Sequence, residues 1–326
     1  MAFRLKLQED LAEEVRRVAL EQVELAEQRL ANVEGVPTAI HDVRRCLKRL
    51  RALARLLRPS LAESVYAREA KRLAGIGRLL SEERDLQVMC ETLDRLEARS
   101  GPLPNGAAGQ VKKLLAHGRR RSKGRNATAD HWQEALAQLA RVRKFFNTEP
   151  ENLSFDVLAQ GLEHAYRKGR KAFRHVHRNP SDETIHALRK AVQLHWRHML
   201  LLSRGWPEAL GARAHEAREL SRLLGDDHDI AVLLGFIRAD VRSANSIRGG
   251  EALADLCRSW QAEIRAQAQP LGERLFADRA GDLRKRVETY WDAARRLRAL
   301  AQDKEQEATP QPADATSSQE PAGSGA

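Results

Sequence analysis

Residues 41–51 read His-Asp-Val-Arg-Arg-Cys-Leu-Lys-Arg-Leu-Arg, and this stretch decides the fold. Apolar residues pass through it in steps of three and four, at Ile40, Val43, Leu47, Leu50, Ala54 and Leu57. This spacing is the period of one face of an α-helix. Nearly all of the chain before residue 302 has the same period, and strand-like alternation is missing. We therefore expect an all-α protein.

A cationic line runs beside the apolar line, offset by one residue. Its members are His41, Arg44, Lys48, Arg51, Arg55 and Arg58. Like charges four residues apart on a helix repel by about 0.2–0.5 kcal/mol per pair. A solvated helix face usually mixes both signs, but no acid follows Asp42 before Glu63. The line therefore predicts a site for an anionic ligand.

Parts of this pattern recur later in the chain at a nearly constant offset. His41 and Arg44 are repeated 145 residues on by His186 and Arg189, which Lys190 follows. Arg78 is repeated by Arg222, and the dipeptide Arg84-Asp85 by His228-Asp229, each 144 residues on. A shared offset at separate sites indicates an internal duplication. We expect two pseudo-symmetric bundles of long antiparallel helices with a basic groove, at residues 1–150 and 151–302.

The second copy carries fewer cations than the first. Its apolar line comprises Ile185, Leu188, Val192, His195, Met199 and Leu202, which places His195 in the core rather than at a ligand. Gln193 stands at the counterpart of Lys48, although Arg197 continues the polar line. We therefore expect the first half to contribute more of the ligand contacts.

Further cations at helical spacing extend the expected groove. Lys71 and Arg78 lie two turns apart with small Ala74 and Gly75 between them, and His215, Arg218 and Arg222 repeat this arrangement. The predicted anion-binding set is His41, Arg44, Arg45, Lys48, Arg49, Arg51, Arg55, Lys71, Arg78, Arg170, Arg174, His186, Arg189, Lys190, Arg197, His215, Arg218 and Arg222.

Glycine, proline and capping residues divide the helices. Ser81 and Ser181, each followed by two acids, predict helix starts, and Pro270 predicts a helix end. The segment 147–152 is the expected boundary between the halves. From Asp303 the chain is rich in Gln, Pro, Ala, Ser and Gly, which cannot bury enough apolar surface, so residues 303–326 are predicted to form a disordered tail.

The overall charge agrees with an anionic partner. Lys and Arg total 56 against 45 Asp and Glu, a net charge of +11. Such an excess favours nucleic acid, anionic lipid or another polyanion as partner. The amino terminus lacks the apolar run of a signal peptide, and three dispersed cysteines suit a reducing compartment. We therefore expect a cytoplasmic protein. We expect no membrane partner, because the apolar stripe beside the cations is needed for the core.

The two histidine motifs, together with Leu80-Ser81-x-x-Arg84-Asp85 and the segment 223–229, resemble the CHAD family of α-helical domains. The resemblance covers most of residues 5–300. It implies two four-helix bundles and a basic channel that binds inorganic polyphosphate, in a module that targets polyphosphate granules and contacts their proteins. It implies no cofactor and requires no catalytic activity. Gln193 and Leu194 depart from the family pattern, which often has Lys or Arg there.

Two other functions remain open. Cationic stripes also suit the phosphodiester backbone of nucleic acids, although only 5% of residues are aromatic and single-strand binding usually needs stacking rings. The run Asp226-Asp227-His228-Asp229 suggests a metal-dependent phosphohydrolase. The first copy has a cation, Arg84, in place of His228, so we assign Asp85 and Asp229 to helix capping or to salt bridges and expect no metal.

Overall fold

The computed structural model describes residues 3–7, 10–31, 36–80, 82–103, 106–123, 127–150, 152–241 and 247–308. Within these ranges the protein is helical and contains no strand, which confirms the predicted all-α class. The first half contains α1 (Leu11–Ala31), α2 (Val36–Leu57), η1 (Arg58–Ser60), α3 (Glu63–Leu79), α4 (Glu82–Ser100), α5 (Ala107–Lys123) and α6 (Ala127–Thr148). The second half contains α7 (Phe155–Arg178), α8 (Asp182–Leu202), η3 (Ser203–Gly205), α9 (Pro207–Val241), α10 (Gly250–Leu275) and α11 (Ala280–Ala308).

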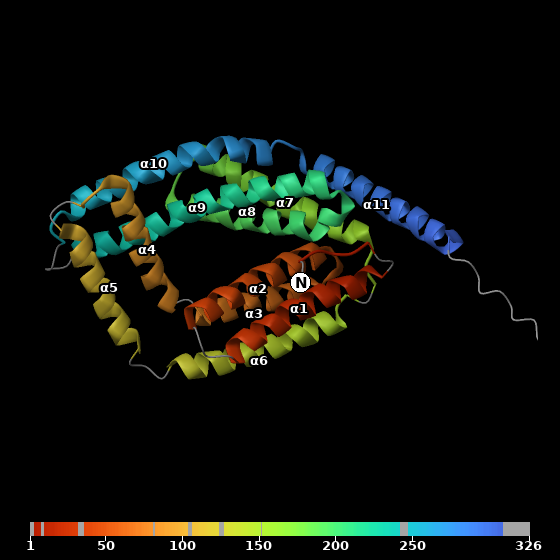
Figure 1. The fold of residues 1–326 in the computed structure, drawn as a ribbon, viewed down its shortest axis with the longest axis horizontal. Helices are drawn as coiled ribbons and strands as arrows, with labels where there is room; N and C mark the ends of the chain where they lie inside the picture. Colours follow the sequence, from red (N-terminus) through yellow and green to blue (C-terminus); the bar gives the residue numbers. More distant parts are fainter. Residues whose placement is uncertain are drawn as a thin grey trace, which may run out of the picture.

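The two halves form two layers that face each other (Figure 1). In one layer α2 and α6 pack on α1, and α3 packs on α2 and α6. In the other layer α8 packs between α7 and α9, α10 covers α9, and α11 lies on α7. The layers meet where α2 contacts α7 and α8, while α4 crosses over and packs on α9. The halves therefore share a long boundary.

Both predicted apolar lines form the core. All six apolar-line residues of α2, from Ile40 to Leu57, and all six of α8, from Ile185 to Leu202, are buried. His195 is among them, as predicted, and its Nε2 accepts a hydrogen bond from Arg213 Nε at 3.0 Å. Because the apolar line of each helix is buried, the residue that follows each apolar position lies at the edge of the helix interface. The cationic lines of α2 and α8 are thereby directed toward the boundary between the halves.

The helix starts agree with the capping signals. Ser181 accepts a hydrogen bond from the Thr184 amide at 3.2 Å, and Thr184 bonds back to the Ser181 amide in a capping box. α4 begins at Glu82, directly after Ser81, which lies outside the described residues.

α1 begins at Leu11 and α7 at Phe155, 144 residues later. This offset is the one found between the motifs, and it is compatible with a duplicated helical unit.

Three elements differ from the sequence-based expectation. Pro270 lies inside α10, where Gly272 fits closely against the ring of Phe173 and tertiary packing offsets the lost hydrogen bond. The run 226–229 lies in the interior of α9, so these residues do not cap a helix start. α11 continues through Ala308, so residues 303–308 of the expected tail are helical, and residues 309–326 lie outside the described residues. No described helix is long and apolar enough to cross a membrane.

Candidate anion-binding pocket

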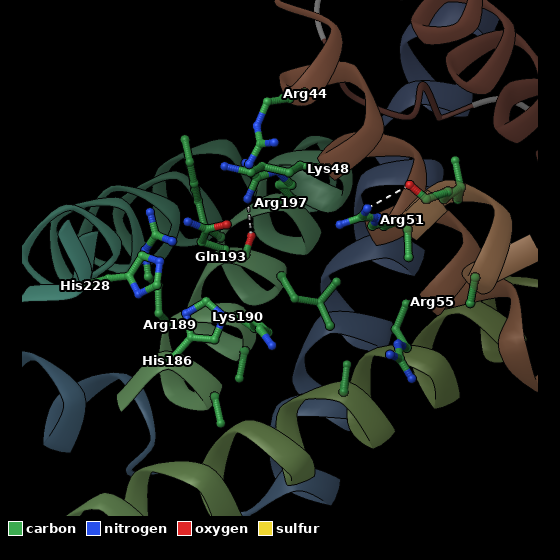
Figure 2. A pocket seen from close by; sticks show the side chains of 18 of the residues that line it. Arg44, Lys48, Arg51, Arg55, His186, Arg189, Lys190, Gln193, Arg197 and His228 are labelled. Carbon is green, nitrogen blue, oxygen red and sulfur yellow. Dashed lines mark hydrogen bonds between the residues drawn. The ribbon is translucent and has the colours of Figure 1, made fainter. Parts of the chain in front are cut away.

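A pocket of about 860 Å³ lies between the two halves of the protein. Helices α2, α3 and α4 supply its lining from the first half, and α7, α8 and α9 supply it from the second. Figure 2 shows basic side chains of α2, α8 and α9 arranged around this common space. Nine Lys or Arg residues line the pocket, namely Arg44, Arg45, Lys48, Arg51, Arg55, Lys168, Arg189, Lys190 and Arg197. Asp229 is the one acid among the described lining residues.

Alanines provide the space between these helices. The lining includes Ala54, Ala70, Ala74, Ala165, Ala172, Ala187 and Ala191, which come from α2, α3, α7 and α8. A side chain of one carbon fills little volume where long cationic side chains converge. The small residues therefore create the pocket, and the cations at its wall determine its charge.

Two of the arginines are oriented by backbone carbonyl groups. Arg51 Nη2 donates to Leu73 O at 2.7 Å, and Arg197 Nη1 donates to Gln193 O at 2.6 Å (Figure 2). Within the described part of the chain, the partners of these two guanidinium groups are carbonyl oxygens and not carboxylates. A carbonyl fixes the direction of a guanidinium without neutralising its charge, so the full positive charge remains in the pocket.

The pocket destabilises its own positive charges. Burial, and then the charges of Arg49 and Arg189, lowers the pKa of Arg197 to about 10, and only 7% of this residue is exposed. Loss of surrounding water, followed by the charges of Arg44 and Arg78, also lowers the pKa of Arg51. Both arginines stay protonated at neutral pH, but their charge is unfavourable there. A bound anion would relieve this cost.

Two histidines from neighbouring helices stack in the same pocket. The rings of His186 in α8 and His228 in α9 are 4.4 Å apart between centroids, with 27° between their planes. Burial, and then the charge of Arg189, lowers the pKa of His228 to about 4. Burial, and then Lys190, lowers the pKa of His186. The pair is therefore neutral at pH 7 without a ligand, and its ring N–H groups can donate to an anion.

A smaller hollow of about 300 Å³ adjoins the pocket beside α3. Its lining contains Arg44, Lys48 and Arg51, which the two cavities share, and also Arg78. Arg44 Nη1 donates to Gly77 O at 3.2 Å, which holds this side chain against the carboxyl-terminal half of α3. The shared cations join the two cavities into one basic surface.

The structure brings eleven of the predicted residues to these cavities. His41, Arg44, Arg45, Lys48, Arg51, Arg55, His186, Arg189, Lys190 and Arg197 line the pocket, and Arg78 lines the hollow. The other seven line neither cavity, namely Arg49, Lys71, Arg170, Arg174, His215, Arg218 and Arg222.

Several of these outer cations have neighbours of their own. Arg49 points toward the first helix and bonds Gln22 at 2.9 Å, whereas Arg170 bonds the carbonyl of Phe276 at 3.0 Å. Arg222 pairs with Glu219 at 3.2 Å. Arg49 and Arg170 therefore lie on helix faces that pack on other elements, whereas Arg222 is exposed. Spacing alone does not distinguish these faces.

Two basic residues that line the pocket, Lys168 and His228, were missing from the predicted set. Lys168 shares one face of α7 with Ala165 and Ala172, and these small residues at steps of three and four indicate a close neighbour. His228 is the repeat partner of Arg84 at the 144-residue offset. The small-residue face and the duplication were therefore the signals that identify these positions.

The acidic run of α9 serves mainly as a set of salt bridges. Asp226 pairs with Arg95 of α4 at 2.5 Å, and Asp229 lies 3.5 Å from the same arginine. Asp227 is buried and pairs with Arg265 of α10 at 2.6 Å. These pairs fit the salt-bridge assignment of Asp229; Asp85 has no described side chain. Within the described ranges no group of three or more His, Cys, Asp or Glu residues is placed to hold a metal ion.

No curated protein matches the chain. The family model described as the CHAD domain matches residues 15–238, about two thirds of the chain, and this range includes every residue that lines the pocket. On this match, and with two histidine motifs on helices that face one basic pocket, the chain belongs to the CHAD domain family.

Proposed function

We propose that this protein binds inorganic polyphosphate in the basic pocket between its halves. The observation that carries the proposal is the convergence of nine Lys or Arg side chains from both halves with one acid. Polyphosphate presents about one negative charge per unit and no bases. One guanidinium group can donate to two phosphate oxygens at once, and lysines act as mobile point charges. Arg51 and Arg197 donate to backbone carbonyl groups, which do not neutralise their charge. Both arginines therefore suit such a ligand.

The size of the pocket favours polyphosphate over duplex nucleic acid. A cavity of about 860 Å³ accepts a slender chain but not a duplex, whose major groove alone is about 12 Å wide. A long polyphosphate would extend beyond the pocket on both sides. We propose that the protein thereby attaches to polyphosphate granules as a binding module in the cytoplasm, and that it performs no catalytic step.

A titration tests this function. Medium-chain polyphosphate, duplex DNA and single-stranded RNA of equal total charge are titrated into the protein at about 150 mM salt. We expect the tightest binding for polyphosphate, with affinity that decreases as salt increases because counterions are released. Arg51→Ala should weaken binding about tenfold or more, the value of one charge-assisted contact. The control is Arg174→Ala, which removes an equal charge from an exposed position outside the pocket. Equal competition by DNA would contradict the proposal.

A further inference from the structure

The aromatic rings that line the pocket lie close to arginine side chains. Of the Phe, Tyr and Trp residues in the described chain, only Tyr66 and Trp196 line it. The guanidinium carbons of Arg55 and Arg58 lie 5.2 Å and 5.1 Å from the centroid of the Tyr66 ring. An aromatic ring attracts such a cation through its negative face. Tyr66 is also 8% exposed, so little of its ring can contact a ligand.

Trp196 is covered in the same way. The guanidinium carbon of Arg197 lies 4.8 Å from its ring centroid, and that of Arg218 lies 6.0 Å away. Arg197 lines the pocket, whereas Arg218 is exposed on α9 and lines neither cavity. Each aromatic ring thus carries one arginine from the pocket wall and one from outside it. The imidazole rings of His186 and His228 cover each other in their stack.

We propose that Tyr66 and Trp196 determine the selectivity of the pocket for phosphate chains without bases over nucleic acids. They act as positioning residues: each ring holds a guanidinium at the pocket wall, where it can contact phosphate. A second arginine lies near each ring from outside the pocket, so a nucleobase would compete with a guanidinium for the ring. Single-strand nucleic-acid proteins gain much of their affinity from such open rings. This inference rests on the proposed polyphosphate site and adds the source of its selectivity.

The decisive variant removes the outer arginine from one ring without altering the pocket wall. Arg218→Ala removes the outer cover of Trp196 and leaves all nine lining cations in place. The matched control is Arg222→Ala, because Arg222 is also exposed on α9, one turn away, but covers no ring. Both variants lose one positive charge. Any general loss of affinity for polyanions affects strands with and without bases alike, so it cancels in the ratio of the two affinities.

The probes separate the effect of bases from that of the backbone. Each protein is titrated with oligo(dT) and with an abasic deoxyribose-phosphate strand of equal length, at matched salt. In Arg218→Ala we expect the affinity for oligo(dT), relative to the abasic strand, to rise about fivefold or more, the value of stacking one base. In Arg222→Ala this ratio should equal that of the unmodified protein. Equal ratios in the two variants would overturn the inference.

A second pair of variants tests the positioning role. Trp196→Leu should weaken polyphosphate binding by about three- to thirtyfold, because Arg197 loses the ring that holds it. Trp196→Phe retains a ring face and should retain most of the affinity. Circular dichroism and thermal melting verify that both variants fold. Equal losses in the two would show that the size of the side chain matters rather than its ring.

The two proposals can fail separately. If the unmodified protein binds oligo(dT) as tightly as polyphosphate, the proposed function is wrong. If it prefers polyphosphate but Arg218→Ala leaves the ratio of oligo(dT) to abasic affinity unchanged, the function stands and the role of the covered rings is wrong.

Discussion

At the residue scale, the position of Arg51 depends on the missing side chain of Gly77. A Cβ atom at residue 77 would lie 2.9 Å from Arg51 Nη2, which is too close for an ordinary contact. The same guanidinium donates to Leu73 O, one turn earlier in α3. Glycine therefore allows the guanidinium of a helix α2 residue to lie directly on the backbone of α3.

We predict that Gly77→Ala weakens polyphosphate binding by about five- to thirtyfold, since Arg51 must move away from its carbonyl partner. The control is Gly75→Ala in the same helix, where the nearest atom, Arg78 Nη2, is 3.9 Å from the added Cβ. Gly75→Ala should stabilise the protein by about 0.5–1 kcal/mol because alanine favours helix, whereas Gly77→Ala should gain less because Arg51 loses its carbonyl partner. Binding titrations and thermal melts measure the two effects. Equal affinities in the two variants would contradict the role of Gly77.

At the element scale, one close crossing of helices brings the halves together. A Cβ atom at Gly161 of α7 would lie 2.1 Å from the carbonyl oxygen of Leu56 in α2, so the two backbones touch. Four residues further on, at Ala165, α7 begins the face that carries Lys168 to the pocket, and α2 carries Arg55. The distance between these helices therefore sets the width of the pocket.

We predict that Gly161→Ala lowers the free energy of unfolding by about 1–3 kcal/mol, the usual cost of overpacking, despite the better helix propensity of alanine. It should also weaken polyphosphate binding, because α2 and α7 must separate. The control is Gly211→Ala in α9, whose added Cβ meets no atom within 4 Å and which should gain stability. Denaturant unfolding measures both. A stable Gly161→Ala protein with full affinity would show that the crossing can relax at little cost.

At the scale of the whole molecule, a buried neutral histidine of the second half bonds to the first half. His198 of α8 is fully buried, and its Nε2 donates to the carbonyl of Ala52 in α2 at 3.0 Å. Burial lowers the pKa of His198 to about 3, and burial also lowers the pKa of His195 well below its usual value. Above pH 6.5 these residues are neutral in both folded and unfolded chains. As pH falls below 6.5, only the unfolded chain takes up the protons, so stability decreases.

We predict that the melting temperature decreases from about pH 6.5 toward pH 4, at about 1.4 kcal/mol of stability per pH unit for each such histidine. His198→Gln keeps a hydrogen-bond donor for Ala52 but cannot titrate, so it should reduce this slope. The control is His175→Gln, at an exposed position of α7. Thermal melts from pH 4 to pH 8 give the comparison. If the slope is the same in all three proteins, acid destabilises the fold through carboxylates instead.

The sequence by itself determined the features that depend on local periodicity. The apolar lines of α2 and α8 fix which face each helix buries, and the adjacent cations therefore lie at the edge of that face. Ser181 and the acids after it determine a helix start without help from distant residues. The order of motifs was sufficient to identify the family because it reflects the linear chain.

Only the tertiary structure decided which cations share the pocket. Arg49 and Arg51 are two residues apart, yet one points to α1 and the other to α3, because different helices pack on the two sides of α2. Packing also keeps α10 helical through Pro270 against the local preference. A helical pattern specifies the direction of a side chain from its own axis. Which residues that side chain contacts depends on helices that are distant in sequence, and the pocket is formed by side chains of such helices.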